Sequence, residues 1–256
     1  MRLAAAFALA AVLAACSTSA PPPAPPSAPG DGAGATDAAH GDRLLAARIG
    51  YAITMRAEGM EQRFDGVRVI EQGDHNGRRV WRTVDSDPSA PAGDTTEVDA
   101  VTLAPVRRVA TSQGMRYAFE DGRVVGEMAY GDEAMPFEID LAGPATASEA
   151  PFELLVAGMD LRPGAVHDLR VFNPYSQSVR PMALTVGDPG ATTTEAGTFD
   201  TLHLDLVPVG GDGLERASFE VLRTAPHYVV RAEYQLPEIA GGGSIGIEAT
   251  DLALLD

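Results

Sequence analysis

Residues 47–57 read ARIGYAITMRA, and their pattern decides the fold. Apolar side chains recur at every second position, namely Ala47, Ile49, Tyr51, Ile53, Met55 and Ala57. Arg48, Thr54 and Arg56 stand between them. Successive side chains of a strand point to opposite faces of a sheet, so this stretch predicts a strand with one apolar and one wet face. Such strands are typical of antiparallel sheets.

The same alternation recurs along the chain, in residues 115–119, 202–206, 230–236 and 245–249. Turn-forming residues separate these segments, with glycine-rich turns at 73–77, 210–213 and 241–243. Asp121-Gly122 is a dipeptide that favours a tight hairpin. We therefore predict a mainly β protein, with a curled antiparallel sheet or half-open barrel of about a dozen strands.

One segment departs from the alternation. Residues 148–159 (SEAPFELLVAGM) combine a capping serine, a proline near a first helical turn and apolar residues at Phe152, Leu155 and Val156. This combination predicts one short helix. It divides the strands into residues 44–143 and 163–255, which could form one continuous sheet or two. A long sheet must curl, close or stack. Its apolar concave face could then enclose a ligand, or be filled by side chains as a core.

The N-terminus predicts export. Residues 3–15 (LAAAFALAAVLAA) form an apolar run that follows Arg2 and is shorter than the roughly 20 residues of a membrane-spanning helix. Residues 1–15 therefore have the plan of a secretory signal peptide. The next residue, Cys16, is the only cysteine of the chain, so no intrachain disulfide can form.

Residues 13–19 (LAACSTS) resemble the lipobox of bacterial lipoproteins. The resemblance implies that Cys16 is acylated and becomes the first residue of the mature chain. It also implies that Ser17 favours sorting to the outer membrane, with the protein on its periplasmic face. Residues 16–43 would then be a lipidated cysteine followed by a Pro/Ala/Gly-rich tether, because a segment without large apolar residues cannot offset its conformational entropy by burial. Residues 44–256 would be the β domain.

Four motifs suggest a family for that domain: residues 119–126 (FEDGRVVG), 159–164 (MDLRPG), 195–199 (EAGTF) and 226–231 (PHYVVR). In this order they resemble the exported bacterial proteins of domain of unknown function 3108. The resemblance implies an antiparallel β domain outside the cytoplasm, and it brings no established activity. Residues 219–224 (FEVLRT) lack the tryptophan that the family often has in this strand.

No motif commits to catalysis. Residues 242–246 (GGSIG) fit the serine-hydrolase elbow pattern, but no histidine follows Ser244, so we interpret them as a turn. The histidines are dispersed along the sequence, which gives no metal-ligand spacing. Asp85, Asp87 and Asp94 lack the glycine and glutamate of a calcium loop and are expected in a solvated acidic turn. We therefore predict no enzyme, no cofactor and no metal.

The formal net charge of −17 and the absence of a basic patch argue against nucleic acid as a partner. Two functions remain. The domain could bind a hydrophobic or amphipathic, lipid-like ligand in the curl of its sheet. Alternatively, it could be a structural or interaction module of the cell envelope, with a protein partner and no ligand cavity.

Overall fold

The computed structural model describes residues 39–57, 59–88, 90–130, 133–148, 152–174, 176–210, 216–235 and 242–255. The predicted signal peptide, Cys16 and most of the predicted tether lie outside these residues. The described fold begins at Ala39, which is buried, and thus starts before the boundary expected at Leu44.

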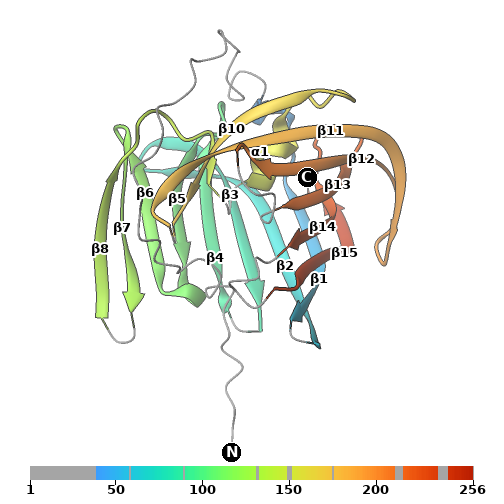
Figure 1. The fold of residues 1–256 in the computed structure, drawn as a ribbon, viewed down its shortest axis with the longest axis horizontal. Helices are drawn as coiled ribbons and strands as arrows, with labels where there is room; N and C mark the ends of the chain where they lie inside the picture. The colour runs from blue at the N-terminus through green and yellow to red at the C-terminus, as the bar shows by residue number, and fades with distance from the viewer. Residues whose placement is uncertain are drawn as a thin grey trace, which may run out of the picture.

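The described residues form one sheet of fifteen strands, which curls around a short helix (Figure 1). The strands are β1 (Ala47–Ala57), β2 (Met60–His75), β3 (Arg78–Asp87), β4 (Ala90–Asp99), β5 (Pro105–Ala110), β6 (Met115–Glu120), β7 (Arg123–Tyr130), β8 (Glu133–Asp140), β9 (Ala147–Ser148), β10 (Val166–Asn173), β11 (Ser178–Thr194), β12 (Gly197–Pro208), β13 (Ala217–Leu222), β14 (Val229–Gln235) and β15 (Ser244–Leu254). The helix is α1 (Phe152–Gly158), and η2 (Gly41–Arg43) and η3 (Thr111–Gln113) are short 3-10 turns.

The spatial order of the strands is β8-β7-β6-β5-β4-β3-β2-β1-β15-β14-β13-β12-β11-β10-β9. The first and last strands of the domain, β1 and β15, therefore pair in the middle of the sheet. This pairing joins both halves of the chain into one continuous sheet, which settles the alternative left open by the sequence. Neighbouring strands run antiparallel except β9 and β10. The predicted fold class is confirmed.

Hairpin turns set the register of neighbouring strands. Asn76 and Gly77 both have positive φ, 53° and 83°, as the tight turn between β2 and β3 requires. The predicted Asp121-Gly122 hairpin joins β6 to β7 with φ values of 46° and 83°. The stretch around Asp85 and Asp94 is different from the prediction. These residues do not lie in a solvated turn. They pair with each other across β3 and β4, because the pairing of the two strands continues from Val80 past both aspartates.

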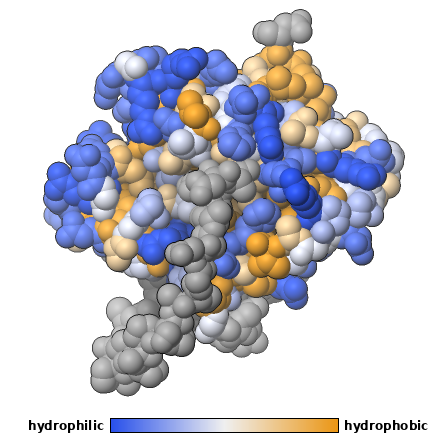
Figure 2. All heavy atoms as spheres, turned by 90° about the horizontal axis from the view of Figure 1, so that it is seen from above, coloured by the Kyte–Doolittle hydropathy of each residue, from blue (hydrophilic) through white to orange (hydrophobic). Residues whose placement is uncertain are grey.

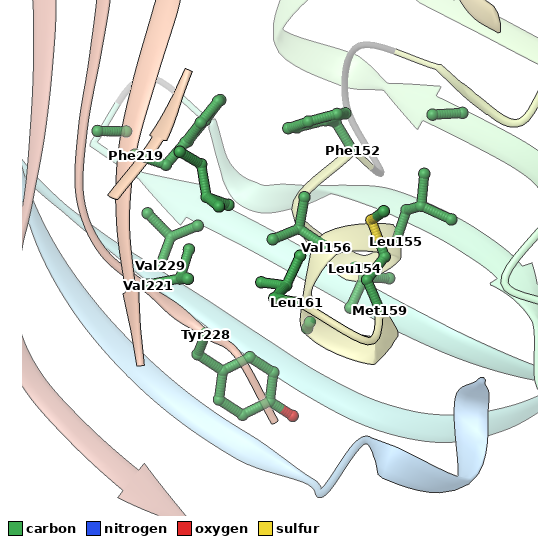
Figure 3. Packing of buried hydrophobic residues seen from close by; sticks show 14 of the residues in the cluster. Phe152, Leu154, Leu155, Val156, Met159, Leu161, Phe219, Val221, Tyr228 and Val229 are labelled. Carbon is green, nitrogen blue, oxygen red and sulfur yellow. The ribbon is translucent and has the colours of Figure 1, made fainter. Parts of the chain in front are cut away.

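Helix α1 confirms the helix predicted within residues 148–159 and fills one half of the curl. Phe152, Leu154, Leu155 and Val156 are all buried, so the helix is apolar on nearly all sides. Its side chains face those of β13 and β14, and the Phe152 and Phe219 rings lie 5.3 Å apart (Figure 3). Burying each side chain of this size contributes about 2 kcal/mol, so α1 is part of the main core.

The residues that enter the domain pack on the end of α1. The backbone N–H of His40 donates to Gly158 O at 2.9 Å, and Trp81 Nε1 donates to Gly41 O at 2.9 Å. A β-carbon on Gly158 would lie 2.7 Å from His40 O, so only glycine permits this close approach. We call residues 39–43 the strap, because they hold the C-terminal end of α1 against the sheet.

Side chains close the curl where its ends meet. Tyr117 and Phe119 of β6 meet Phe172 of β10, each with its ring centroid 5.5 Å from that of Phe172 and in edge-to-face geometry. The Tyr117 hydroxyl also lies 3.3 Å from Ser148 Oγ on β9. Edge-to-face pairs of this kind favour association beyond the area that they bury. The two ends of the sheet thus touch through side chains while the backbone ladder stays open.

The tip of the β11–β12 hairpin folds over the convex face of the central strands. Glu195 pairs with Arg63 of β2 at 2.5 Å, and Arg231 of β14 donates to Thr193 O at 2.6 Å. The backbone N–H of Ala196 donates to Ala249 O at 3.2 Å. With α1 on the other side, part of the central strands is covered on both faces.

Candidate functional site

An apolar strip continues along the concave face beyond α1. Ile53 pairs with Phe64 on one side and with Ile247 on the other, so the three side chains share a face. Ile53 lies two positions after Tyr51, which packs in the core, and therefore points to the concave face. We define the concave strip as Ile53, Met55, Phe64, Tyr234 and Ile247. All five are half-buried, whereas the neighbouring residues around α1 are buried completely.

Charged groups lie between the concave strip and α1. Arg68 of β2 donates through Nε to Asp85 Oδ1 at 2.5 Å and pairs through Nη1 with Glu153 of α1. The hydroxyl of Tyr234, a member of the strip, donates to the other oxygen of Glu153 at 3.3 Å. The guanidinium of Arg68 also lies 5.6 Å from the ring centroid of Tyr51. Glu153 of the helix thus contacts two strands, β2 and β14, and Arg68 connects it further to Asp85 of β3.

The protonation states of this cluster follow from burial and charge. Burial raises the pKa of the Tyr51 hydroxyl to about 12, so Tyr51 stays protonated at neutral pH. Burial opposes the charged form of Arg68, but the negative charge of Asp85 outweighs it and raises the pKa of the guanidinium above its usual value. Arg68 therefore remains a cation in the interior and must keep its carboxylate partners there.

A second ionic group lies farther along the same face. Asp94 of β4 accepts hydrogen bonds from Ser112 Oγ at 2.8 Å and faces Arg108 of β5 at 3.9 Å. Arg108 also donates to Thr96 Oγ1 at 3.2 Å. We call Arg68, Asp85, Asp94, Arg108 and Glu153 the ionic band. Within the described ranges no group of three His, Cys, Asp or Glu side chains could hold a metal ion, including the aspartates considered for calcium.

The half of the curl that contains α1 is filled. A cavity of about 10 Å³ remains between the helix and the sheet, bordered by Tyr51, Arg68, Glu153 and Tyr228. A space of this size holds about one water molecule. An enclosed ligand space was one of the two outcomes expected of the concave face, and around α1 the other outcome, a packed core, is observed. The concave strip is the part of this face that α1 leaves half-exposed.

Three of the five histidines have separate protein partners. His75 Nδ1 contacts Glu97 on the convex face at 2.9 Å, and His203 lies between Asp205 and Glu220. His227 is buried, with Nδ1 2.7 Å from Leu222 O, and burial lowers its pKa.

Ser244 of the GGSIG motif begins β15 after the positive-φ glycines Gly242 and Gly243, in agreement with a turn.

Sequence reasoning missed Arg68 and Glu153 as site residues. Glu153 was seen only as part of a helix, and Arg68 as a polar residue of a strand. Figure 2 shows hydrophobic side chains as separate patches among hydrophilic ones on one face of the molecule, so surface composition alone does not select a site either. None of the helices within the described part of the chain is long and apolar enough to cross a membrane.

Comparisons with known proteins give structural similarity only. No family model matches this chain, and no curated protein matches it, so the resemblance to domain of unknown function 3108 stays a prediction. A β-barrel-like protein of domain of unknown function 1849 from Brucella abortus has 15% identity and a TM-score of 0.47, over 84% of this chain and 99% of that one.

Two other solved structures are similar at lower scores. A putative lipoprotein from Parabacteroides distasonis has 11% identity and a TM-score of 0.33, over 85% of this chain and 100% of that one. A LolA superfamily protein from Nitrosomonas europaea has 10% identity and a TM-score of 0.33, over 83% and 87%. Similarity at this level does not transfer a function to this chain.

Proposed function

We propose that this chain is a lipid-anchored protein of the cell envelope that binds a hydrophobic or amphipathic, lipid-like ligand on the concave strip. The ligand chain would lie along Ile53, Phe64 and Ile247, and its head would reach the ionic band. No chemical step is part of this proposal. The lipid anchor would be Cys16. The membrane would be the partner of the acylated N-terminus and not of the strip.

The half-exposed concave strip is the observation that carries the proposal. Its side chains come from four adjacent strands, β2, β1, β15 and β14, and three of them, Ile53, Tyr234 and Ile247, pack against the main core. Contiguous apolar surface with a polar group at one end is typical of sites for amphipathic ligands. Tyr234 connects the two parts, since its ring lies in the strip and its hydroxyl donates to Glu153.

The anchor rests on the sequence of residues 13–19 alone. Two or three acyl chains on Cys16 would hold the protein on a bilayer far more firmly than one chain does. Residues 17–38 would connect this anchor to the strap. By the same resemblance, Ser17 favours the outer membrane, with the domain in the periplasm.

The competing function is a structural or interaction module that uses an edge or the convex face. The packed core around α1 favours this alternative, because the space between α1 and the sheet there is about 10 Å³. A polar substitution at Ile53 distinguishes the two proposals, since only ligand binding requires an apolar strip there.

Binding of decyl maltoside, an uncharged amphiphile, tests the proposal by calorimetric titration below its micelle concentration. Ile53→Asp places a charge in the strip and is expected to abolish binding. Val166→Asp is the control, because Val166 is 60% exposed on β10, outside the strip. Thermal unfolding of both variants verifies that they fold. Equal binding by wild type and Ile53→Asp, or no binding by the wild type, would refute the proposal.

A further inference from the structure

We infer that the concave strip selects amphiphiles whose head carries an ammonium group over those with an anionic head. The inference rests on the proposed function and adds the chemical class of the ligand. Its basis is the composition and pairing of the ionic band, together with the position of the band at the end of the strip.

The ionic band has more negative than positive groups. Arg68 and Arg108 face the carboxylates of Asp85, Asp94 and Glu153, so one negative charge remains without a compensating arginine within the band. These groups are largely shielded from water: the side chains of Arg68, Glu153 and Asp94 are 16%, 14% and 12% exposed. Charges interact more strongly in such surroundings than at a solvated surface.

The guanidinium of Arg68 is already engaged. Its Nε donates to Asp85, its Nη1 pairs with Glu153, and its face lies over Tyr51. An anionic head would have to displace one of these carboxylates and leave it unpaired in the interior, which is costly. A carboxylate or phosphate head therefore has no ready partner at Arg68.

A cationic head meets the opposite situation. Asp85 is the most exposed member of the Arg68 cluster, with 34% of its side chain accessible, and it uses Oδ1 toward Arg68. Gly66 separates Phe64 of the strip from Arg68 on β2, and beside Gly66 on β3 a second carboxylate, Asp87, lies between the strip and Asp85. An ammonium group is a hydrogen-bond donor without acceptor capacity and complements such a carboxylate.

Three probes with the same decyl chain test the inference: decylammonium, decyl maltoside and decanoate, each titrated calorimetrically below its micelle concentration. Decylammonium is expected to bind the wild type about tenfold more tightly than decanoate, with decyl maltoside between them. Asp85→Asn is expected to reduce the preference for decylammonium over decanoate to less than about threefold. High salt is expected to reduce the preference in the wild type, which provides a test even if Asp85→Asn does not fold.

The outcomes separate the two claims. Equal or tighter binding of decanoate than of decylammonium by the wild type overturns the inference, while the proposed function stands. A preference for decylammonium that neither Asp85→Asn nor salt reduces also overturns it, because the selectivity would then come from elsewhere. Failure of all three probes to bind refutes the proposed function itself.

Discussion

Arg68 of β2 and Glu153 of α1 form an ion pair that joins the sheet to the helix within its curl. Both side chains are largely buried, and each has a further partner, Asp85 for Arg68 and Tyr234 for Glu153. The pair lies at the border between a filled core and the half-exposed concave strip. The same two residues therefore stabilise the fold and border the proposed ligand site.

Replacing Glu153 by Ala is expected to lower the free energy of unfolding by about 3 kcal/mol, because Arg68 then loses one of its buried carboxylate partners. Urea unfolding followed by circular dichroism measures this change. Glu61→Ala is the control. It breaks the Arg56–Glu61 pair, whose side chains are 54% and 60% exposed, and should change stability by less than about 1 kcal/mol. Equal effects of the two substitutions would contradict the role given to Glu153.

The strap predicts a second stability effect. Trp81→Phe keeps an aromatic ring in the core but removes the hydrogen bond from Nε1 to Gly41 O. The expected cost is about 1–2 kcal/mol, since the buried carbonyl is left without this donor. Hydrogen exchange at the amide of His40, which donates to Gly158 O, should accelerate in the same variant. Unchanged exchange there would show that the strap does not depend on Trp81.

Asp99 makes the stability of the fold depend on pH in the acidic range. Burial opposes the charged form, but hydrogen bonds from Thr102, Arg78 and Val101 lower the pKa of Asp99 to about 2. The stabilisation is thus fully present above the ordinary carboxyl pKa of about 4 and is lost as the pH falls toward 2. Asp99→Ala should cost about 1–2 kcal/mol at pH 7 and almost nothing near pH 2. A gap in unfolding midpoint that stays constant over this range would be inconsistent with that assignment.

His227 predicts a separate effect nearer neutral pH. Burial lowers its pKa, so the folded protein binds the proton less readily than the unfolded chain does. Stability should therefore decrease as the pH falls below about 6.5, the ordinary value for histidine. His227→Asn should flatten this part of the stability profile. A stability profile that still falls below about pH 6.5 in His227→Asn would contradict this assignment.

The anchor can be tested independently of the domain. Cys16→Ser is expected to move the protein from the membrane fraction to the soluble envelope fraction, because no acyl chain can then be attached. Mass spectrometry of the wild type should show the corresponding mass increase on Cys16. An unmodified Cys16 in membrane-bound protein would require another mode of attachment.

The alternation in residues 47–57 predicted β1 because its two faces meet different environments, and the capping and apolar residues of 148–159 predicted α1. The β3–β4 hairpin was missed, since Asp85 and Asp94 are polar residues that point inward to arginines rather than outward to water. The continuity of the sheet was also beyond reach. It depends on pairing of β1 with β15, and local periodicity does not report which distant strands pair.

The ion pair between Arg68 and Glu153 could not be predicted for the same reason. Each residue is unremarkable within its own segment, and their proximity arises only when the sheet curls around α1. The concave strip was visible in part, because Ile53, Met55 and Ile247 occupy apolar positions of alternating strands. Its half-exposed state depends on where α1 ends, which the sequence pattern does not specify.

The most direct test of the central claim is photo-crosslinking with an alkyl chain that carries a diazirine, followed by peptide mapping. The account predicts that labelled residues fall on the concave positions of β1, β2, β14 and β15, with Ile53, Phe64 and Ile247 among them. An excess of decyl maltoside should suppress this labelling. Labelling that is confined to other strands, such as β8 or β10, or that excess decyl maltoside does not reduce, would contradict the claim that the concave strip binds an amphipathic ligand.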